Sequence, residues 1–263
     1  MRRSLAALLL LAVLPAAASA DGPALPAPLA DGGTAKVVAV VDGDTVSLDD
    51  GREVRLVGIQ APKLPLGRPD FVAWPLASDA RAALENLARG KTVRLGYGGR
   101  QIDRYRRALA HLFLADGTWL QEALLTAGLA RVYTFADNRA LAGRLQAAES
   151  AARKAGRGIW VHPFYAIIAA DNAGMRLDEF ALVEGRVVET AVVRGRAYLN
   201  FGADWKRDFT VSVAPADLRT MTRAGFDPTA LAGRRIRVRG WIEWLNGPMI
   251  DLTHPEQIEV LAE

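Results

Sequence analysis

The stretch KVVAVVDGDTVSLDDGREVRLVGI, residues 36–59, decides the fold. Its runs of valine, leucine and isoleucine predict three short strands, at Lys36–Val41, Thr45–Leu48 and Glu53–Ile59. The segments DGDT and DDG separate these runs, and both have the Asp-Gly composition of tight turns. Short turns connect antiparallel neighbours, so the stretch predicts a three-stranded meander.

The next hundred residues alternate between helical and extended patterns. Apolar residues recur at helical spacing in Pro75–Arg89, Leu120–Ala127 and Asn138–Ala155. The runs Thr92–Gly96 and Ala108–Leu114 return to strand character. Three strands, a helix, two strands and closing helices are the order of the OB-fold, a small Greek-key barrel.

The same order of elements repeats in the C-terminal part of the chain. Strand-like runs lie on both sides of one helical segment, Pro215–Ala224, and Asn246-Gly247 is a strong hairpin signal. The repeat predicts a second OB-like β-barrel, and a generic β-sandwich is the alternative. The predicted fold class is therefore mainly β with α (α+β), with an OB-fold barrel and packed helices followed by this second barrel.

Three arginines alternate along one predicted strand of the second half. Arg235, Arg237 and Arg239 fall on one face, and Ile236 and Val238 fall on the other. Alternation of this kind predicts that the aliphatic side chains point inward and that the arginines form an exposed basic face. Such a face suits single-stranded nucleic acid, while a protein partner for the second domain is the other interpretation.

The N-terminus has the pattern of a secretory signal. Arg2 and Arg3 precede a continuous apolar run that ends at Ala18-Ser19-Ala20, a small-residue cleavage site. We therefore expect export to the periplasm or the medium, and no membrane span. The predicted segments are a signal peptide at 1–20, a flexible leader at 21–35, the first OB-fold domain at 36–161, a linker at 162–175 and the second domain at 176–263.

The composition allows an anionic partner without requiring one. The formal net charge is +4, and the densest basic cluster consists of arginines around Tyr105. Such a cluster suits the backbone of a nucleic acid or another polyanion, with Tyr105 stacking on a base; the alternative is a solvated loop. The chain has no cysteine and its three histidines are far apart, which gives no disulfide, zinc site or Ser-His-Asp group. The cluster comprises Arg100, Arg104, Arg106 and Arg107.

Four ordered blocks of the N-terminal half resemble the staphylococcal nuclease family. They are VVDGDTV at 40–46, RLVGIQAP at 55–62, DRYRRALAHLFLADGTWLQEALLTAGLARVY at 103–133 and GRGIW at 156–160. The resemblance covers roughly residues 36–160 and leaves the C-terminal domain outside it. It implies a Ca²⁺-dependent phosphodiesterase built on an OB barrel, acting on nucleic acid.

The resemblance implies roles for particular residues. Asp44 matches an aspartate that holds calcium, and Arg55 and Arg107 match the two arginines that clamp the phosphate. Gln60 stands where the second calcium-binding aspartate is expected. Lys63 stands where a glutamate would orient or deprotonate the attacking water. In the next block, an arginine, Arg106, replaces a usual glycine.

These exchanges predict an altered site. A protonated lysine cannot act as a base, and a neutral amide cannot take a proton from water. Asp70 or Asp103 would have to supply the missing carboxylate. The charges suggest instead that Lys63 takes part of the place of the ion, so that Arg55 and Arg107 bind phosphate without a metal. Asp44 remains the candidate metal ligand if Ca²⁺ still binds.

Three functions follow from this sequence, in order of preference. The first is an exported nuclease-like protein that binds nucleic acid or another phosphodiester ligand, through Arg55, Arg104, Tyr105, Arg106 and Arg107, without ordinary Ca²⁺-dependent hydrolysis. The second is an active phosphodiesterase or endonuclease with an altered site, in which Arg55, Arg107 and Lys63 are catalytic. The third is a non-enzymatic envelope module that binds protein.

Overall fold

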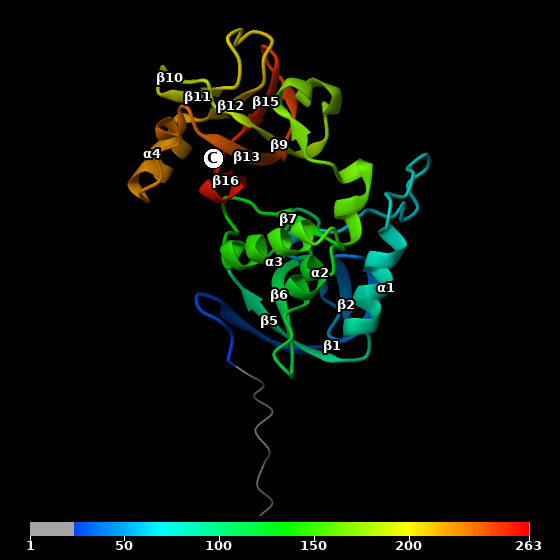
Figure 1. The fold of residues 1–263 in the computed structure, drawn as a ribbon. Coiled ribbons are helices and arrows are strands. Elements are labelled where there is room, and N and C mark those ends of the chain that lie inside the picture. The colour runs from blue at the N-terminus through cyan, green and yellow to red at the C-terminus, as the bar shows by residue number, and fades with distance from the viewer. Residues whose placement is uncertain (1–23, 263) are drawn as a thin grey trace, which may run out of the picture.

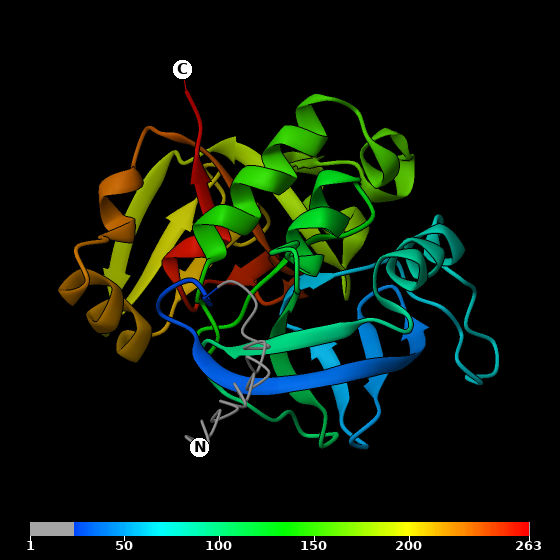
Figure 2. The ribbon, with the colours of Figure 1, turned by 90° about the horizontal axis from the view of Figure 1, so that it is seen from below.

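The computed structural model describes residues 24–262, which form two halves with separate hydrophobic cores (Figures 1 and 2). The predicted signal peptide at 1–20 lies outside the described residues. No helix in the described part is long and apolar enough to cross a membrane. The elements of the N-terminal half are β1 (Ala30–Asp42), β2 (Thr45–Leu48), β3 (Glu53–Leu56), β4 (Gly58–Gln60), α1 (Ala77–Ala88), β5 (Thr92–Tyr97), β6 (Ala108–Leu114), α2 (Leu120–Thr126), β7 (Arg131–Tyr133) and α3 (Ala142–Lys154).

Five strands of this half close into a barrel in the order β1-β2-β3-β6-β5. The first three strands form the predicted antiparallel meander, and β3 then pairs parallel with β6. Alternate residues such as Val37, Val46 and Val54 are fully buried inside the barrel, because successive side chains of a strand point to opposite faces. The predicted OB-fold barrel with packed helices is confirmed.

The third predicted strand, Glu53–Ile59, divides into two elements. Gly58 has φ +84, a conformation that glycine adopts without strain. A Cβ at Gly58 would lie 2.5 Å from Cδ1 of Leu145, so helix α3 also requires a glycine there. The chain turns at this point, and β4 pairs with β7 outside the barrel. The three-residue strand β7 was not predicted from the sequence.

Strand β1 starts earlier than predicted. Ala30 pairs with Tyr97 and Asp31 pairs with Gly96, although the sequence predicted a flexible leader as far as residue 35. The leader prediction is therefore wrong for the residues from Ala30 onward. Their glycine and alanine content hid the strand, which is held by backbone pairing with β5 and by an ion pair between Asp31 and Arg94 at 2.7 Å.

The C-terminal half contains two sheets, in the orders β10-β11-β12-β15-β14 and β16-β13-β9-β8. These sheets enclose the second core, but the second closed OB-like barrel is not confirmed. Sheet pairing in this half begins at β8, within the predicted linker. The strands and the helix are β8 (Ile168–Ala169), β9 (Phe180–Arg186), β10 (Glu189–Val193), β11 (Arg196–Asn200), β12 (Thr210–Val213), α4 (Pro215–Arg223), β13 (Arg235–Trp241), β14 (Glu243–Trp244), β15 (Pro248–Asp251) and β16 (Ile258–Val260). Short 3-10 helices lie at η1 (Gly158–Val161), η2 (Pro163–Tyr165), η3 (Ala170–Arg176), η4 (Pro228–Leu231) and η5 (Pro255–Gln257).

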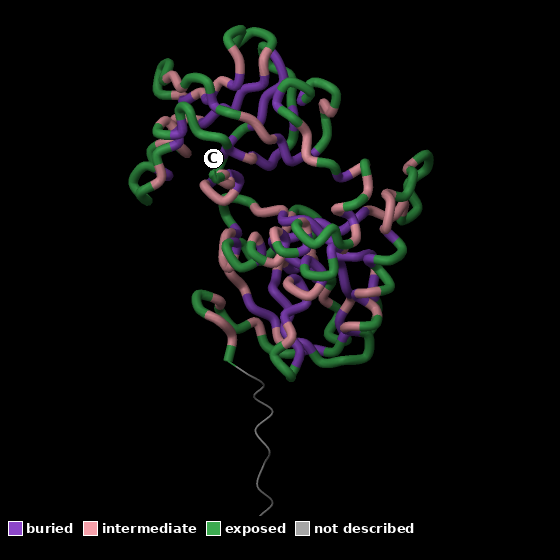
Figure 3. The backbone as a smooth tube through the Cα atoms, in the orientation of Figure 1, coloured by how far each residue is buried: buried purple, intermediate pink, exposed green. Residues whose placement is uncertain are grey.

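Strand β13 corrects the prediction of an exposed basic face. Ile236 and Val238 point into the core as predicted, and the arginines share the other face. That face, however, packs toward helix α3 of the first half (Figure 1). Most of β13 is buried or intermediate (Figure 3), and Arg239 is only 1% exposed. Its guanidinium binds Glu149 of α3 at 2.8 Å and also Glu259 of β16. Alternation identifies a shared face but does not say what covers it.

Further contacts join the two halves beside this ion pair. Arg139 forms a two-pronged ion pair with Glu256, at 2.7 and 2.8 Å. The ring of His254 lies 2.8 Å from the hydroxyl of Thr134. Together with the buried Arg239 side chain, these contacts fix the orientation of the second half on the first.

Two buried histidines predict that stability falls in mild acid. Burial lowers the pKa of His111 to about 4, and burial is also the main cause that lowers the pKa of His254 to about 4. Below about pH 6.5 the unfolded chain takes up protons at these rings that the folded chain does not, so stability decreases as the pH falls. The loss continues down to about pH 4 and reaches roughly 3 kcal/mol per histidine.

Urea unfolding at a series of pH values checks this expectation. His111→Leu should reduce the dependence of unfolding free energy on pH in the acid range. Leu112→Ala is the control, because it removes a fully buried neighbour on β6 without removing a titrating group. It should lower stability at every pH and keep the wild-type slope. An unchanged slope in His111→Leu would contradict the prediction.

Candidate functional site

A buried ion cluster lies at the turn between β1 and β2. Asp44 is fully buried, and both of its carboxylate oxygens accept hydrogen bonds from Nζ of Lys63 at 2.8 Å. The backbone N–H of Ala61 donates to the same carboxylate at 2.6 Å, and Nη2 of Arg55 lies 3.2 Å away. Asp42 adds a second carboxylate 3.6 Å from the Lys63 amine. Lys63 therefore faces Asp44, between two acidic side chains.

Asp44 and Lys63, the central pair of this cluster, stabilise each other's charges. Burial by itself would raise the pKa of Asp44, but Arg55 and Lys63 outweigh it and hold the pKa below its usual value. Burial lowers the pKa of Lys63, and the contact with Asp44 opposes that shift. Burial and the nearby Asp44 raise the pKa of Asp42. The central contact is thus an ion pair between Asp44 and Lys63.

Gln60 is turned away from this cluster. Its Oε1 accepts hydrogen bonds from Nε and Nη2 of Arg131 on β7, at 2.9 and 2.7 Å. Arg131 is itself buried, burial lowers its pKa to about 10, and its guanidinium lies 4.7 Å from the ring centroid of Phe180 in the second half. Arg131 was not predicted as a site residue, because the short strand that places it beside Gln60 has no recognisable sequence pattern.

The residues at this turn do not fit a calcium ion. Ca²⁺ takes six to eight oxygen ligands, whereas here the two carboxylates of Asp42 and Asp44 converge on the ammonium group of Lys63. The oxygen of Gln60 faces a guanidinium instead. Within residues 24–262, no cluster of three or more acidic or histidine side chains is placed to hold a metal ion. The cation at these two carboxylates is therefore the ammonium group of Lys63, a side chain of the protein itself.

Arg55 connects the cluster to a neighbouring cleft. Its guanidinium donates to the carbonyls of Leu56 and Ile59, both at 2.7 Å, in addition to its contact with Asp44. Most of its hydrogen-bonding capacity is therefore used inside the protein. Arg55 still forms part of the cleft wall, and its role in binding phosphate stays a prediction.

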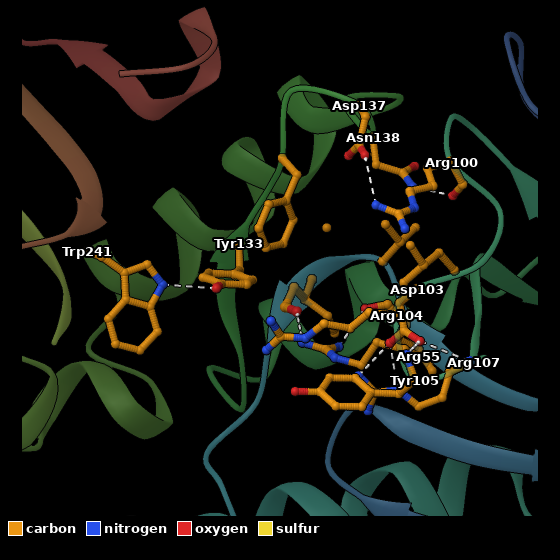
Figure 4. Close-up of a pocket in the computed structure, with 16 residues that line it drawn as sticks. Arg55, Arg100, Asp103, Arg104, Tyr105, Arg107, Tyr133, Asp137, Asn138 and Trp241 are labelled. Carbon is orange, nitrogen blue, oxygen red and sulfur yellow. Dashed lines mark hydrogen bonds and ion pairs between the residues drawn. The ribbon is translucent and has the colours of Figure 1, made fainter. Parts of the chain in front are cut away.

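The cleft has a volume of about 550 Å³ and a basic lining (Figure 4). Four arginines and two aspartates line it, which leaves a net positive charge. Aromatic rings form another part of the wall. The side chains discussed below are Arg55, Arg100, Asp103, Arg104, Tyr105, Arg107, Tyr133, Phe135, Asp137 and Trp241.

Asp103 organises the basic loop of the cleft. Its carboxylate accepts the backbone N–H groups of Tyr105 and Arg107, at 2.8 and 2.9 Å, and pairs with the Arg107 guanidinium at 2.7 Å. Tyr105 is 63% exposed, and its ring centroid lies 4.8 Å from the guanidinium of Arg104 and 5.4 Å from that of Arg107. The loop thus presents an aromatic face close to two cations. Among the described residues, Nη1 of Arg107 has no hydrogen-bond partner.

Not every predicted residue reaches the cleft. Arg106 has φ +66 at the turn of the loop and does not line the cleft. This left-handed conformation explains why a glycine is usual at this position. Lys63 and Asp44 also lie outside the lining and meet it only through Arg55. Asp70, one of the two carboxylates considered as a substitute, is absent from the cleft as well.

Three aromatic residues of the cleft were not predicted from the sequence: Tyr133, Phe135 and Trp241. Tyr133 and Phe135 pack edge to face, with ring centroids 4.9 Å apart. Tyr133 is the last residue of the unpredicted strand β7, Phe135 follows that strand, and Trp241 comes from the second half. Only the folded arrangement of the two halves could reveal this wall.

Comparison with known proteins agrees with the barrel fold of the N-terminal half. Residues 53–162 match the family described as staphylococcal nuclease homologue. The thermonuclease of Staphylococcus hyicus is 32% identical over 130 residues, which cover 48% of this chain and 75% of that protein. An uncharacterized endonuclease of Escherichia coli is 34% identical over 128 residues, with 48% and 75% covered. The chain belongs, through its N-terminal half, to the staphylococcal nuclease family.

Proposed function

We propose that this chain is an exported protein that binds single-stranded nucleic acid through its basic cleft without a metal ion, and that it has lost ordinary Ca²⁺-dependent hydrolysis. Membership of a nuclease family and the related thermonuclease and endonuclease support nucleic acid as the ligand. One observation carries the metal-free part of the proposal. The ammonium of Lys63 lies 2.8 Å from the Asp44 carboxylate, where a divalent cation would otherwise be needed.

None of the three site groups considered from the sequence, Gln60, Lys63 and Asp103, is free to take a proton from water. Lys63 is engaged by two carboxylates and Gln60 by a guanidinium. Asp103 is the remaining candidate base from the sequence, but it accepts two backbone N–H groups and pairs with Arg107. Burial by itself would raise the pKa of Asp103, but these contacts outweigh it and hold the pKa below its usual value. Asp103 is therefore a weak proton acceptor.

The cleft has the features of a single-strand binding site. Guanidinium groups bind phosphate oxygens strongly, and exposed aromatic rings stack on unpaired bases. Arg104, Tyr105 and Arg107 supply both kinds of group on one loop. A duplex, whose bases already stack on each other, would gain the phosphate contacts without the stacking.

Arg107→Ala tests this proposal. Loss of a charge-assisted hydrogen bond to phosphate should weaken binding about tenfold. It should also reduce the slope of log affinity against log salt concentration by about 1. Fluorescence anisotropy of a labelled single-stranded oligonucleotide, measured with chelator over a range of salt concentrations, gives both quantities. A labelled duplex in the same titration should bind more weakly.

Arg223→Ala is the matched control, because Arg223 is exposed on α4 and lies outside the cleft. It should leave the affinity and the salt slope unchanged. Equal effects of the two substitutions would contradict the assignment to the cleft. Chelator-sensitive cleavage that Arg107→Ala abolishes would support the active phosphodiesterase instead, and absence of any salt-dependent binding would favour the protein-interaction module.

A further inference from the structure

The second half of the molecule contributes one side chain to the cleft of the first. Trp241 is the last residue of β13, on the same strand face as the arginines that pack against the first half. It lies beyond their ion pairs, is 48% exposed and lines the cleft. A large aromatic side chain that is half exposed at the edge of a basic cleft has apolar surface available for a ligand.

Trp241 is held in a defined position. Its indole N–H donates to the hydroxyl of Tyr133 at 3.1 Å, a contact between the two halves. Trp241 pairs with Phe180 across the sheet, and their rings pack edge to face at 6.5 Å. Phe180 in turn packs edge to face on Tyr133 at 4.7 Å. The ring is therefore preorganised, so that a ligand need not order it on binding.

The aromatic wall of the cleft continues away from the basic loop that carries Arg104 and Arg107. Figure 4 shows Tyr133 between Trp241 and the group formed by Arg55, Arg104 and Tyr105. A nucleic-acid strand with a phosphate at the arginines would reach Tyr133 first and Trp241 only if it continued further. The order of these side chains along the cleft thus corresponds to successive nucleotides of a bound nucleic-acid strand.

We propose that Trp241 is a stacking platform for a nucleobase beyond the one at Tyr105, and that the second half extends the cleft toward longer single strands. This inference rests on the proposed function of the cleft. It assigns to the C-terminal half a role in binding that adds to the contacts made by the nuclease-like half. Stacking on an exposed ring needs an unpaired base, so the extension discriminates against duplexes.

The test compares oligothymidylates of two lengths by fluorescence anisotropy in the presence of chelator. Trp241→Ala should weaken binding of the hexanucleotide by about tenfold, because stacking on an aromatic side chain is lost. Binding of the dinucleotide, which ends before Trp241, should change little. Trp241→Phe retains an aromatic face and loses the hydrogen bond to Tyr133, so it should restore most of the affinity for the hexanucleotide.

Trp244→Ala is the matched control, because Trp244 is a neighbouring tryptophan that is 62% exposed and lies outside the cleft. It should bind both lengths like the wild type. If the wild type binds the hexanucleotide and Trp241→Ala binds it equally well, the inference is wrong while the proposed function stands. An equal loss for both lengths, or no rescue by Trp241→Phe, shows a structural role and also overturns it. If the wild type binds neither length, the proposed function fails and the inference fails with it.

Discussion

Replacing Arg239 with methionine is expected to lower the free energy of unfolding by about 3–5 kcal/mol. The substitution leaves Glu149, which is fully buried, without its closest partner from the second half. Arg153 still lies 3.1 Å from the same carboxylate, but it is one cation in place of two. Because this ion pair joins the two halves, urea unfolding followed by circular dichroism should also separate into two transitions.

Arg235→Met is the control for this effect. Arg235 lies on the same strand and the same face, with its side chain 55% exposed, and it pairs with Glu184. An exposed ion pair contributes at most about 1 kcal/mol, so this variant should unfold nearly like the wild type. If both variants lose a similar free energy of unfolding, the loss comes from removing any arginine of this strand face. That result would contradict the prediction that the buried ion pair of Arg239 is the more stabilising one.

The fold of the N-terminal barrel was predictable because its signals are local. The strand runs and Asp-Gly turns of residues 36–59 specify antiparallel neighbours a few residues apart, and the register in the structure follows them. The second half gave equally clear strands, but its arrangement as two sheets depends on pairing between distant segments such as β12 and β15. Sequence patterns indicate strands and do not determine which distant strands pair.

The candidate site likewise contains contacts that the sequence could predict and contacts that it could not. Asp44 and Lys63 could be predicted as neighbours because the resemblance placed both at one site, and they lie in contact. The partner of Gln60 could not, since Arg131 is 71 residues away in the chain. No sequence feature indicated that Trp241, which lies on a strand of the second half, would line the cleft of the first.

Lys63→Ala is expected to lower the free energy of unfolding by about 3 kcal/mol or more, because a buried charge loses one of its cations. Asp44 would keep Arg55 at 3.2 Å and the N–H of Ala61 at 2.6 Å, but Asp42 would lose its nearest cation. Two carboxylates would then lie together at a turn with no ammonium between them. Urea unfolding at neutral pH measures the loss, and Lys36→Ala, an exposed lysine on β1, is the control that should change stability little.

Calcium should distinguish the variant from the wild type. In the proposed wild-type site, Lys63 holds the position that the ion would need, so Ca²⁺ should leave the thermal unfolding midpoint unchanged. In Lys63→Ala, a divalent cation between Asp42 and Asp44 would replace the lost positive charge, and a ligand that binds only the folded chain raises its stability. Added Ca²⁺ should therefore recover part of the loss in the variant. If isothermal titration finds stoichiometric micromolar Ca²⁺ binding to the wild type, Lys63 does not take the place of the metal ion, because both cations could not occupy the same carboxylates.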